Sequence, residues 1–306
     1  MPIKLPADLP AYQILQGERV PVMADDRAAK QDIRPLEIAI LNLMPEKVKT
    51  ETQFARLLGN SPIQVSLTLM QTGTYAPTHT DKAHLQAFYK PFDALKDHRF
   101  DGLIITGAPI ETLPFEDVKY WAELQQVFTW ARTHVYSSFF VCWGAQAALN
   151  HHYGVPKYEL PEKRFGIYTH ENLRPSCDLM RGINDQFAMP VSRHTEVRAD
   201  DLPQNIEVLA TSPEAGVGMV ADWNKREFYV FNHLEYDRET LQTEYERDLA
   251  KGAAIQLPHN YFPGNDPSHA PPNMWRAFAT VVFQNWLNYV YQGTPYDLKE
   301  LSANAV

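Results

Sequence analysis

Residues 137–150 read SSFFVCWGAQAALN, and they join an apolar run typical of a buried strand to a run typical of a helix. The change falls at Cys142, and Gly144 follows it closely. A sharp turn from strand to helix lifts the side chain at its tip out of the sheet. The first helical amide groups, beginning with that of Trp143, then lie beside the thiol, where they favour a thiolate and can hold an oxyanion. Cys142 is therefore either a nucleophile or a buried apolar residue, because cysteine is among the residues most often buried.

Strand-like and helix-like segments alternate along the chain on both sides of this turn. The predicted strands are 36–43, 63–71, 100–109 and 137–142. The predicted helices are 50–60, 80–95, 115–134 and 143–154. We expect Thr50 to be the N-cap of the first helix, with Gln53 completing a capping box, and Gly154 to end the last one. This order predicts an α/β fold in which a mostly parallel sheet carries helices on both faces.

The remaining segments show no convincing linker. Residues 1–35 are rich in proline and charge, and we expect an irregular N-terminal arm there. Short strand patterns within residues 155–232 either extend the same sheet or form an antiparallel edge. Helical patterns at 238–252 and 271–293 close the chain. The predicted organisation is the arm, 1–35, followed by a single α/β domain, 36–306.

The composition of the chain excludes several classes of protein. It has 306 residues, of which 44% are hydrophobic, enough for a large core. A net charge of -9 disfavours a sequence-independent nucleic-acid binder, which needs a basic face. Two cysteines and no CxxC pair indicate a reducing compartment and no zinc site. No segment is typical of a signal peptide or a membrane span, so we expect a cytoplasmic protein with no membrane partner.

Three further polar features follow predicted strands, and ligands of open α/β sheets bind at the carboxyl ends of the strands. His233 and Glu235 lie two residues apart in FYVFNHLEYD, where the carboxylate either orients the imidazole or shares a solvated strand end with it. Lys47, in LNLMPEK, either stabilises an oxyanion at the rim of a site or lies in solvent. Glu111, in TGAPIET, either faces a pocket or belongs to an ordinary loop. Gly107 in the same loop permits a close approach of the backbone to a ligand.

Eight motifs give the chain a family resemblance. In chain order they are LNLMPEK, TGAPIE, FVCWGAQAAL, SRHTEVR, HLEYD, YERD, NYFPGNDP and NWLNYVYQGTPYDL. On these motifs, which run across nearly the whole chain, the sequence resembles the homoserine O-acyltransferases of the homoserine trans-succinylase type. The resemblance implies a fold like a class I glutamine amidotransferase domain, with the nucleophile at the turn from strand to helix.

The resemblance also implies roles for particular residues. Cys142 matches the nucleophile that takes the acyl group from acyl-CoA as a thioester. His233 matches the general base that activates the acceptor hydroxyl, Glu235 the residue that orients it, and Lys47 a lysine of the active-site rim. The positions that match acceptor-binding residues are Lys163, Ser192 and Arg247. An arginine suits the α-carboxylate of an amino acid because it can form a bidentate pair.

Glu111 indicates the acyl donor. In the family that the chain resembles, glycine at the matching position goes with succinyl-CoA and glutamate with acetyl-CoA. A glutamate fills space and brings a negative charge to the place where a succinyl carboxylate would sit. We therefore expect a ping-pong transfer of acetyl from acetyl-CoA, a co-substrate, to the hydroxyl of L-homoserine, in methionine biosynthesis. We expect no bound cofactor and no metal, and the resemblance implies a homodimer.

Departures from the family pattern leave alternatives open. Asn232, His233 and Leu234 stand where the family usually has Gly-His, and WRAFATV, starting at Trp275, lacks a histidine and a glycine of the family. An enzyme that acetylates L-serine, for cysteine biosynthesis, would use the same residues, since one methylene gives only about 1–3 kcal/mol of discrimination. A glutaminase-type amidase and a non-catalytic regulatory paralogue are two further alternatives.

Overall fold

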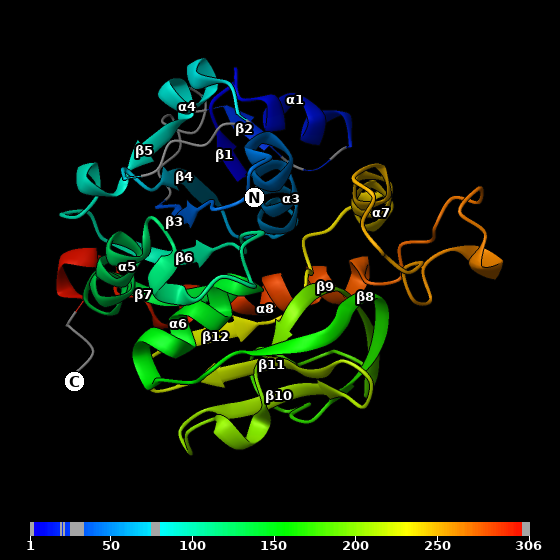
Figure 1. The fold of residues 1–306 in the computed structure, drawn as a ribbon. Coiled ribbons are helices and arrows are strands. Elements are labelled where there is room, and N and C mark those ends of the chain that lie inside the picture. The colour runs from blue at the N-terminus through cyan, green and yellow to red at the C-terminus, as the bar shows by residue number, and fades with distance from the viewer. Residues whose placement is uncertain (1–2, 19, 21, 25–33, 75–79, 302–306) are drawn as a thin grey trace.

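One mixed sheet with helices on both faces makes up the protein in a computed structural model that describes residues 3–18, 20, 22–24, 34–74 and 80–301 (Figure 1). The strands are β1 Ile3–Leu5, β2 Val22–Ala24, β3 Leu36–Leu41, β4 Val65–Gln71, β5 Tyr89–Pro91, β6 Phe100–Ile105, β7 Val135–Val141, β8 Tyr158–Asn172, β9 Gln186–Glu196, β10 Glu207–Ser212, β11 Gly216–Asp222 and β12 Glu227–Val230. The α-helices are α1 Pro10–Gly17, α3 Lys47–Gly59, α4 Lys82–Phe88, α5 Trp121–His134, α6 Trp143–Tyr153, α7 Thr240–Ala250 and α8 Arg276–Gly293. The 3-10 helices are η1 Phe92–Ala94, η2 Phe115–Asp117, η3 Ala199–Asp201, η4 Pro263–Asn265 and η5 Leu298–Glu300.

The sheet has a parallel part and an antiparallel part. Its strand order is β2-β1-β4-β3-β6-β7-β12-β11-β10-β8-β9, with β5 paired to β4. The pairs from β2 to β12 are parallel. Those from β12 to β9 are antiparallel. The predicted fold class is confirmed, and the strands of residues 155–232 extend the same sheet as its antiparallel end.

The central strands are apolar runs because helices cover both of their faces. All residues of β6 are buried, and only one residue in each of β3 and β7 is less than fully covered. Successive side chains of β3 serve the two faces in turn: Ile38 and Ile40 belong to one hydrophobic cluster, Ala39 and Leu41 to the other. Parallel strands buried on both sides require this continuous hydrophobicity.

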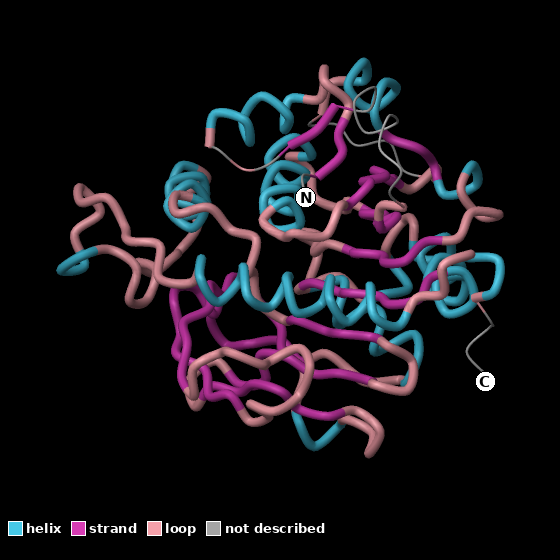
Figure 2. Tube along the Cα trace, turned by 180° about the vertical axis from the view of Figure 1, so that it is seen from behind, coloured by secondary structure: helices cyan, strands magenta, loops and turns pink. Residues whose placement is uncertain are grey.

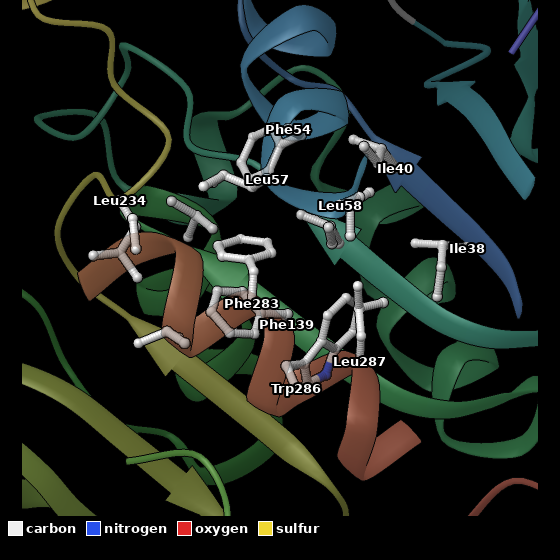
Figure 3. Close-up of a cluster of buried hydrophobic side chains, with 14 of the residues drawn as sticks. Ile38, Ile40, Phe54, Leu57, Leu58, Phe139, Leu234, Phe283, Trp286 and Leu287 are labelled. Atoms are coloured by element: carbon white, nitrogen blue, oxygen red, sulfur yellow. The ribbon is translucent and has the colours of Figure 1, made fainter. Parts of the chain in front are cut away.

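Helices α3 and α8 cover one face of the sheet, and α5 and α6 the other (Figures 1 and 2). In the first layer, Phe54 from α3 and Phe283 from α8 pack beside Phe139 of β7 (Figure 3). Trp286 of α8 lies so close to the sheet that a Cβ on Gly102 would be 2.9 Å from its Cη2. The glycine therefore permits the helix to seat on β6.

The N-terminal segment is not the irregular arm that we expected. Strand β1 pairs in parallel with both β2 and β4, and so adds to one edge of the sheet. Ile3 and Leu5 are fully buried, and Leu15 of α1 lies in the same core. Residues 25–33, also expected in the arm, lie outside the described residues.

Helix α3 begins at Lys47, three residues before the expected N-cap. Thr50 lies inside the helix, and its hydroxyl donates to the Glu46 carbonyl at 3.2 Å. Gln53 donates instead to Asp237 and Thr240, both at 3.2 Å. The predicted capping box is wrong because α3 already starts at Lys47, which places both Thr50 and Gln53 inside the helix. The Gln53 side chain binds residues at and just before the start of α7 instead. By contrast, Gly154 ends α6 at φ 69°, as predicted.

Candidate functional site

Cys142 lies at a sharp turn between β7 and α6. Its φ of 51° and ψ of -119° are unusual for a residue other than glycine and store roughly 1–3 kcal/mol of strain. The Cys142 amide donates to the Val230 carbonyl of β12 at 2.7 Å, and its carbonyl accepts from the Ala145 amide at 3.0 Å. These bonds at the strand end and in the first helical turn hold the strained residue in place. The turn predicted from the sequence is confirmed.

Two glycines allow the chain to close around this turn. A Cβ on Gly144 would lie 2.6 Å from the Thr106 carbonyl oxygen, so α6 can begin against the end of β6 only without a side chain there. A Cβ on Gly107 would lie 3.6 Å from Cys142 Sγ and 3.7 Å from His233 Cε1. The backbone at Gly107 therefore passes beside both the thiol and the imidazole.

The pairing of β7 with β12 brings His233 and Glu235 to the same edge of the sheet as Cys142. Val141 is in register with Val230, and the two strands are parallel, so the residues after each strand meet. His233 Nδ1 lies 2.7 Å from Glu235 Oε1. The ring stacks on Tyr236 with a centroid distance of 4.1 Å, and the exposed fractions of His233 and Glu235 are only 3% and 8%.

The electrostatics of this set favour a charged imidazole. Burial works to lower the pKa of His233, but the charges of Cys142 and Glu235 and their hydrogen bonds outweigh it and raise the pKa well above 6.5. A protonated imidazole is the partner that stabilises a thiolate, and a carboxylate on its far nitrogen fixes its orientation. The arrangement can therefore support nucleophilic attack by sulfur and proton transfer by His233.

A cavity of about 2100 Å³ opens in front of Cys142 and His233. The other predicted site residues among its lining are Lys47, Glu111, Lys163, Ser192 and Arg247. Glu235 is not part of this lining, and instead supports His233 from behind. The Trp143 side chain is fully buried in the core, so only its backbone amide is placed to contact a reacting group.

Lys47 is not a solvated surface lysine. It is 4% exposed, and its ammonium donates to the carbonyls of Asn42 at 2.5 Å and Met44 at 3.2 Å. Burial lowers its pKa to about 8, although the charge of Glu51 acts in the opposite direction. The structure therefore holds an ammonium, with one N–H to spare, at the wall of the cavity.

Glu111 lies at another part of the cavity, in the loop after β6. The Lys157 ammonium binds the carbonyl oxygens of Glu111 and Leu113 and so fixes the loop. The Glu111 carboxylate is half-buried and brings negative charge to the lining.

The predicted acceptor residues surround a carboxylate that sequence reasoning missed, Glu244 of α7. Lys163 Nζ lies 3.3 Å from Glu244 Oε2, and the Ser192 hydroxyl donates to the same oxygen at 2.5 Å. The Tyr236 hydroxyl donates to Glu244 Oε1 at 2.6 Å. Burial would raise the pKa of Glu244, but Lys163 and the two hydroxyl groups lower it overall, so Glu244 is ionised.

Arg247 and Glu244 share one face of α7. The side chain of Arg247 is 49% exposed and pairs with Asp248 at 2.7 Å. Glu244, Arg247 and Asp248 have helical spacings of three and four residues, which was the available signal for Glu244. That spacing alone did not distinguish it from an ordinary surface carboxylate.

The described residues hold neither a cluster of metal-binding side chains nor a helix suited to spanning a membrane. Within them, no group of three or more His, Cys, Asp or Glu side chains is placed to hold a metal ion. None of the helices in the described part is long and apolar enough to cross a membrane.

Comparison with known sequences places the chain among acyltransferases. The family model described as homoserine O-succinyltransferase matches residues 2–296. A homoserine O-acetyltransferase of Rhizobium leguminosarum bv. trifolii is 52% identical over 303 residues, covering 98% of this chain and 99% of that protein. One from Acetivibrio thermocellus is 53% identical over 304 residues, covering 98% and 100% of the two chains. The resemblance predicted from the motifs is confirmed.

Comparison with solved structures supports the fold. A glutamine amidotransferase from Thermotoga maritima superposes with a TM-score of 0.53, covering 85% of this chain and 100% of that one, at 11% identity. One from Methylobacillus flagellatus gives a TM-score of 0.52 at 12% identity, with coverages of 84% and 95%. The predicted likeness to the class I glutamine amidotransferase fold is confirmed.

Proposed function

The chain belongs to the homoserine O-succinyltransferase family and is a homoserine O-acyltransferase, and we propose that it moves acetyl from acetyl-CoA to the hydroxyl of L-homoserine through a thioester on Cys142. The observation that carries this proposal is the arrangement of Cys142, His233 and Glu235 at one edge of the sheet, open to a large cavity. Acetyl-CoA is a co-substrate here, and a cytoplasmic homodimer remains a prediction.

In the first half-reaction the Cys142 thiolate attacks the carbonyl carbon of acetyl-CoA. The carbonyl oxygen becomes an oxyanion, for which the Trp143 amide at the start of α6 and the Lys47 ammonium are the proposed donors. When this tetrahedral species collapses, the bond from carbon to the CoA sulfur breaks. The departing CoA sulfur takes the proton from His233 and leaves as the thiol, and acetyl remains on Cys142.

In the second half-reaction the now neutral His233 accepts the proton of the acceptor hydroxyl. The hydroxyl oxygen attacks acetyl-Cys142, the carbon–sulfur bond breaks, and the Cys142 thiolate is restored beside a protonated His233. Glu235 holds Nδ1 throughout, so that Nε2 carries the proton in both half-reactions.

The acceptor would bind through its two charged groups. Arg247 can pair with the α-carboxylate of L-homoserine, because half of its side chain is open to the cavity and to solvent. Glu244, ionised and with a side chain 14% exposed, is suited to the α-ammonium group, while Lys163 and Ser192 hold it in position. Both contacts leave the side-chain hydroxyl free to approach Cys142.

The donor assignment depends on Glu111. Its carboxylate would lie near the terminal carboxylate of a succinyl group, and like charges close together disfavour binding. Relatives at 52% and 53% identity bear the name homoserine O-acetyltransferase, which supports the same choice.

Release of CoA thiol tests the proposal with acetyl-CoA or succinyl-CoA as donor and L-homoserine or L-serine as acceptor. We expect release with acetyl-CoA and L-homoserine, and little with the other three pairs. Release with L-serine would establish the alternative acceptor. Release from succinyl-CoA alone would overturn the assignment of Glu111, and ammonia release from glutamine would favour an amidase.

A further inference from the structure

A chain of buried polar side chains leads away from the Lys47 ammonium. The Lys47 ammonium binds the carbonyl of Asn42, and the Asn42 amide donates to the Tyr89 hydroxyl at 2.9 Å. The Tyr89 hydroxyl donates in turn to Glu51 Oε2 at 2.8 Å, and His84 Nε2 lies 3.1 Å from Glu51 Oε1. The exposed fractions of Asn42, Lys47, Glu51 and Tyr89 are all 5% or less.

Stability of helix α3 does not explain the buried Glu51. A fully buried carboxylate carries a desolvation penalty of several kcal/mol in order of magnitude. Lys47 precedes Glu51 by four residues, and this is the less favourable order for such a pair on a helix. The first turn of α3 also contains Lys47 and Lys49 but no acidic residue, which opposes the helix dipole.

We propose that Glu51 is a positioning residue for acyl transfer: through Tyr89 and Asn42 it fixes the Lys47 ammonium beside the reacting thioester. An ammonium has three N–H groups, and the carbonyls of Asn42 and Met44 take two of them. The third remains for the cavity that Lys47 lines. This inference rests on the proposed acetyl transfer through Cys142.

The charges around Lys47 agree with this role. Its titratable neighbours are Glu51 on α3, His84 on α4 and Tyr89 on β5, with Cys142 and His233 in the same cavity wall. Glu46, the residue just before α3, pairs with Lys49 instead. Burial lowers the pKa of Lys47 to about 8, and of these groups Glu51 is the one whose charge raises it. Without that charge the Lys47 pKa falls further, and the ammonium is lost closer to neutral pH.

The rate of Cys142 acetylation, followed by rapid quench across pH, tests the inference in Glu51→Gln. We expect the alkaline limb of the profile to move down by about one pH unit, since a charge nearby shifts a pKa by about that much. At about pH 8 the rate falls severalfold, whereas near pH 6.5 it stays close to that of the unaltered protein. In a Lys47→Ala background Glu51→Gln has no further effect, because two residues that act as a unit are not additive.

Matched variants separate positioning from a merely structural role. Thr52→Val changes a buried hydroxyl on the same helix, bonded to the Val48 carbonyl, and should keep the unaltered pH profile. Tyr89→Phe breaks the link between Asn42 and Glu51 and should slow acetylation without moving the alkaline limb. If Glu51→Gln does not fold, as judged by thermal unfolding, an unchanged rate in Tyr89→Phe overturns the inference.

Two results in the folded Glu51→Gln protein would also overturn it: an unmoved alkaline limb, or an equal loss of rate with and without Lys47. The failure of the proposed function has a different signature. In that case the unaltered protein itself gains no acetyl group on Cys142.

Discussion

Replacing Glu235 with alanine removes the carboxylate that lies 2.7 Å from His233 Nδ1. The two residues are 8% and 3% exposed, so water cannot readily replace the lost contact. A hydrogen bond to a charged group contributes about 1.5–3 kcal/mol, and turnover should therefore fall roughly 10- to 150-fold. Glutamine keeps a neutral acceptor for Nδ1 but loses the charge. Because a charge-assisted bond is about twice as strong as a neutral one, Glu235→Gln should be slower by only roughly 3- to 12-fold.

Stopped-flow measurement of CoA release resolves where this loss falls. The first turnover without acceptor reports acetylation of Cys142, and the steady state with L-homoserine includes the second half-reaction. We expect both phases to slow, because the charge of Glu235 raises the His233 pKa and so supports both the thiolate and the proton transfers. Glu239→Gln, which alters an exposed carboxylate paired with Arg238, is the matched control and should stay within about twofold. Normal rates in Glu235→Ala would refute the reasoning, and so would equal losses in the alanine and glutamine variants.

Three other perturbations have defined outcomes. Glu111→Gly should admit succinyl-CoA and raise its relative use at least about fivefold in the CoA-release assay, since two carboxylates about 4 Å apart repel by about 1–4 kcal/mol. Unchanged donor preference would contradict the assignment. Gly144→Ala places a Cβ 2.6 Å from a backbone oxygen and should lower the free energy of unfolding by about 1–3 kcal/mol. Gly17→Ala is the control, because its Cβ would meet nothing within 4 Å. Equal denaturation midpoints for the two variants would contradict the close contact at Gly144. Burial lowers the pKa of His170 to about 4, below the value of 6.5 expected in the unfolded chain. The neutral His170 therefore contributes fully to the free energy of unfolding above pH 6.5, and this contribution, about 3 kcal/mol in all, is lost as the pH falls toward 4. A His170→Gln protein whose stability declines equally steeply in denaturant titrations would contradict this.

Local sequence pattern was sufficient for the turn at Cys142 and for the central strands. The apolar run before Cys142 and the helical run with Gly144 after it are both local signals, and both appear in the structure as β7 and α6. To predict that Cys142 and His233 lie together, one must also assume that β12 lies parallel beside β7, as it does in the structure. Because parallel strands present their carboxyl ends at one edge of a sheet, the sequence alone led us to expect Cys142 and His233 at the same edge.

Features that depend on distant partners could not be predicted. Strand β1 has three residues, too few for a periodic signal, and it forms only because β2 and β4 pair with it. The hairpin of β8 and β9 contains Pro161 and Pro190, which obscure an alternating pattern, and its register shifts between Glu159 and Arg164.

The burial of Lys47 and the partial burial of Glu244 were equally hard to predict from the sequence. LNLMPEK predicted a polar end of a strand around Lys47, and YERD beside Glu244 predicted the surface of a helix. Tertiary partners bury the one and partly cover the other: the Asn42 carbonyl and Tyr89 ring lie against Lys47, and Tyr236 and Ser192 bind Glu244.

The acetyl-enzyme itself gives the most direct test of the central claim. The unaltered protein is mixed with acetyl-CoA in the absence of acceptor, digested under acidic conditions and analysed by mass spectrometry, with Cys142→Ala beside it. Our account predicts one acetyl group on the peptide that contains Cys142, its absence in Cys142→Ala, and its loss as O-acetyl-L-homoserine when L-homoserine is added. Turnover with L-homoserine but no acetyl group on Cys142, or turnover that persists in Cys142→Ala, would contradict transfer through this thiol.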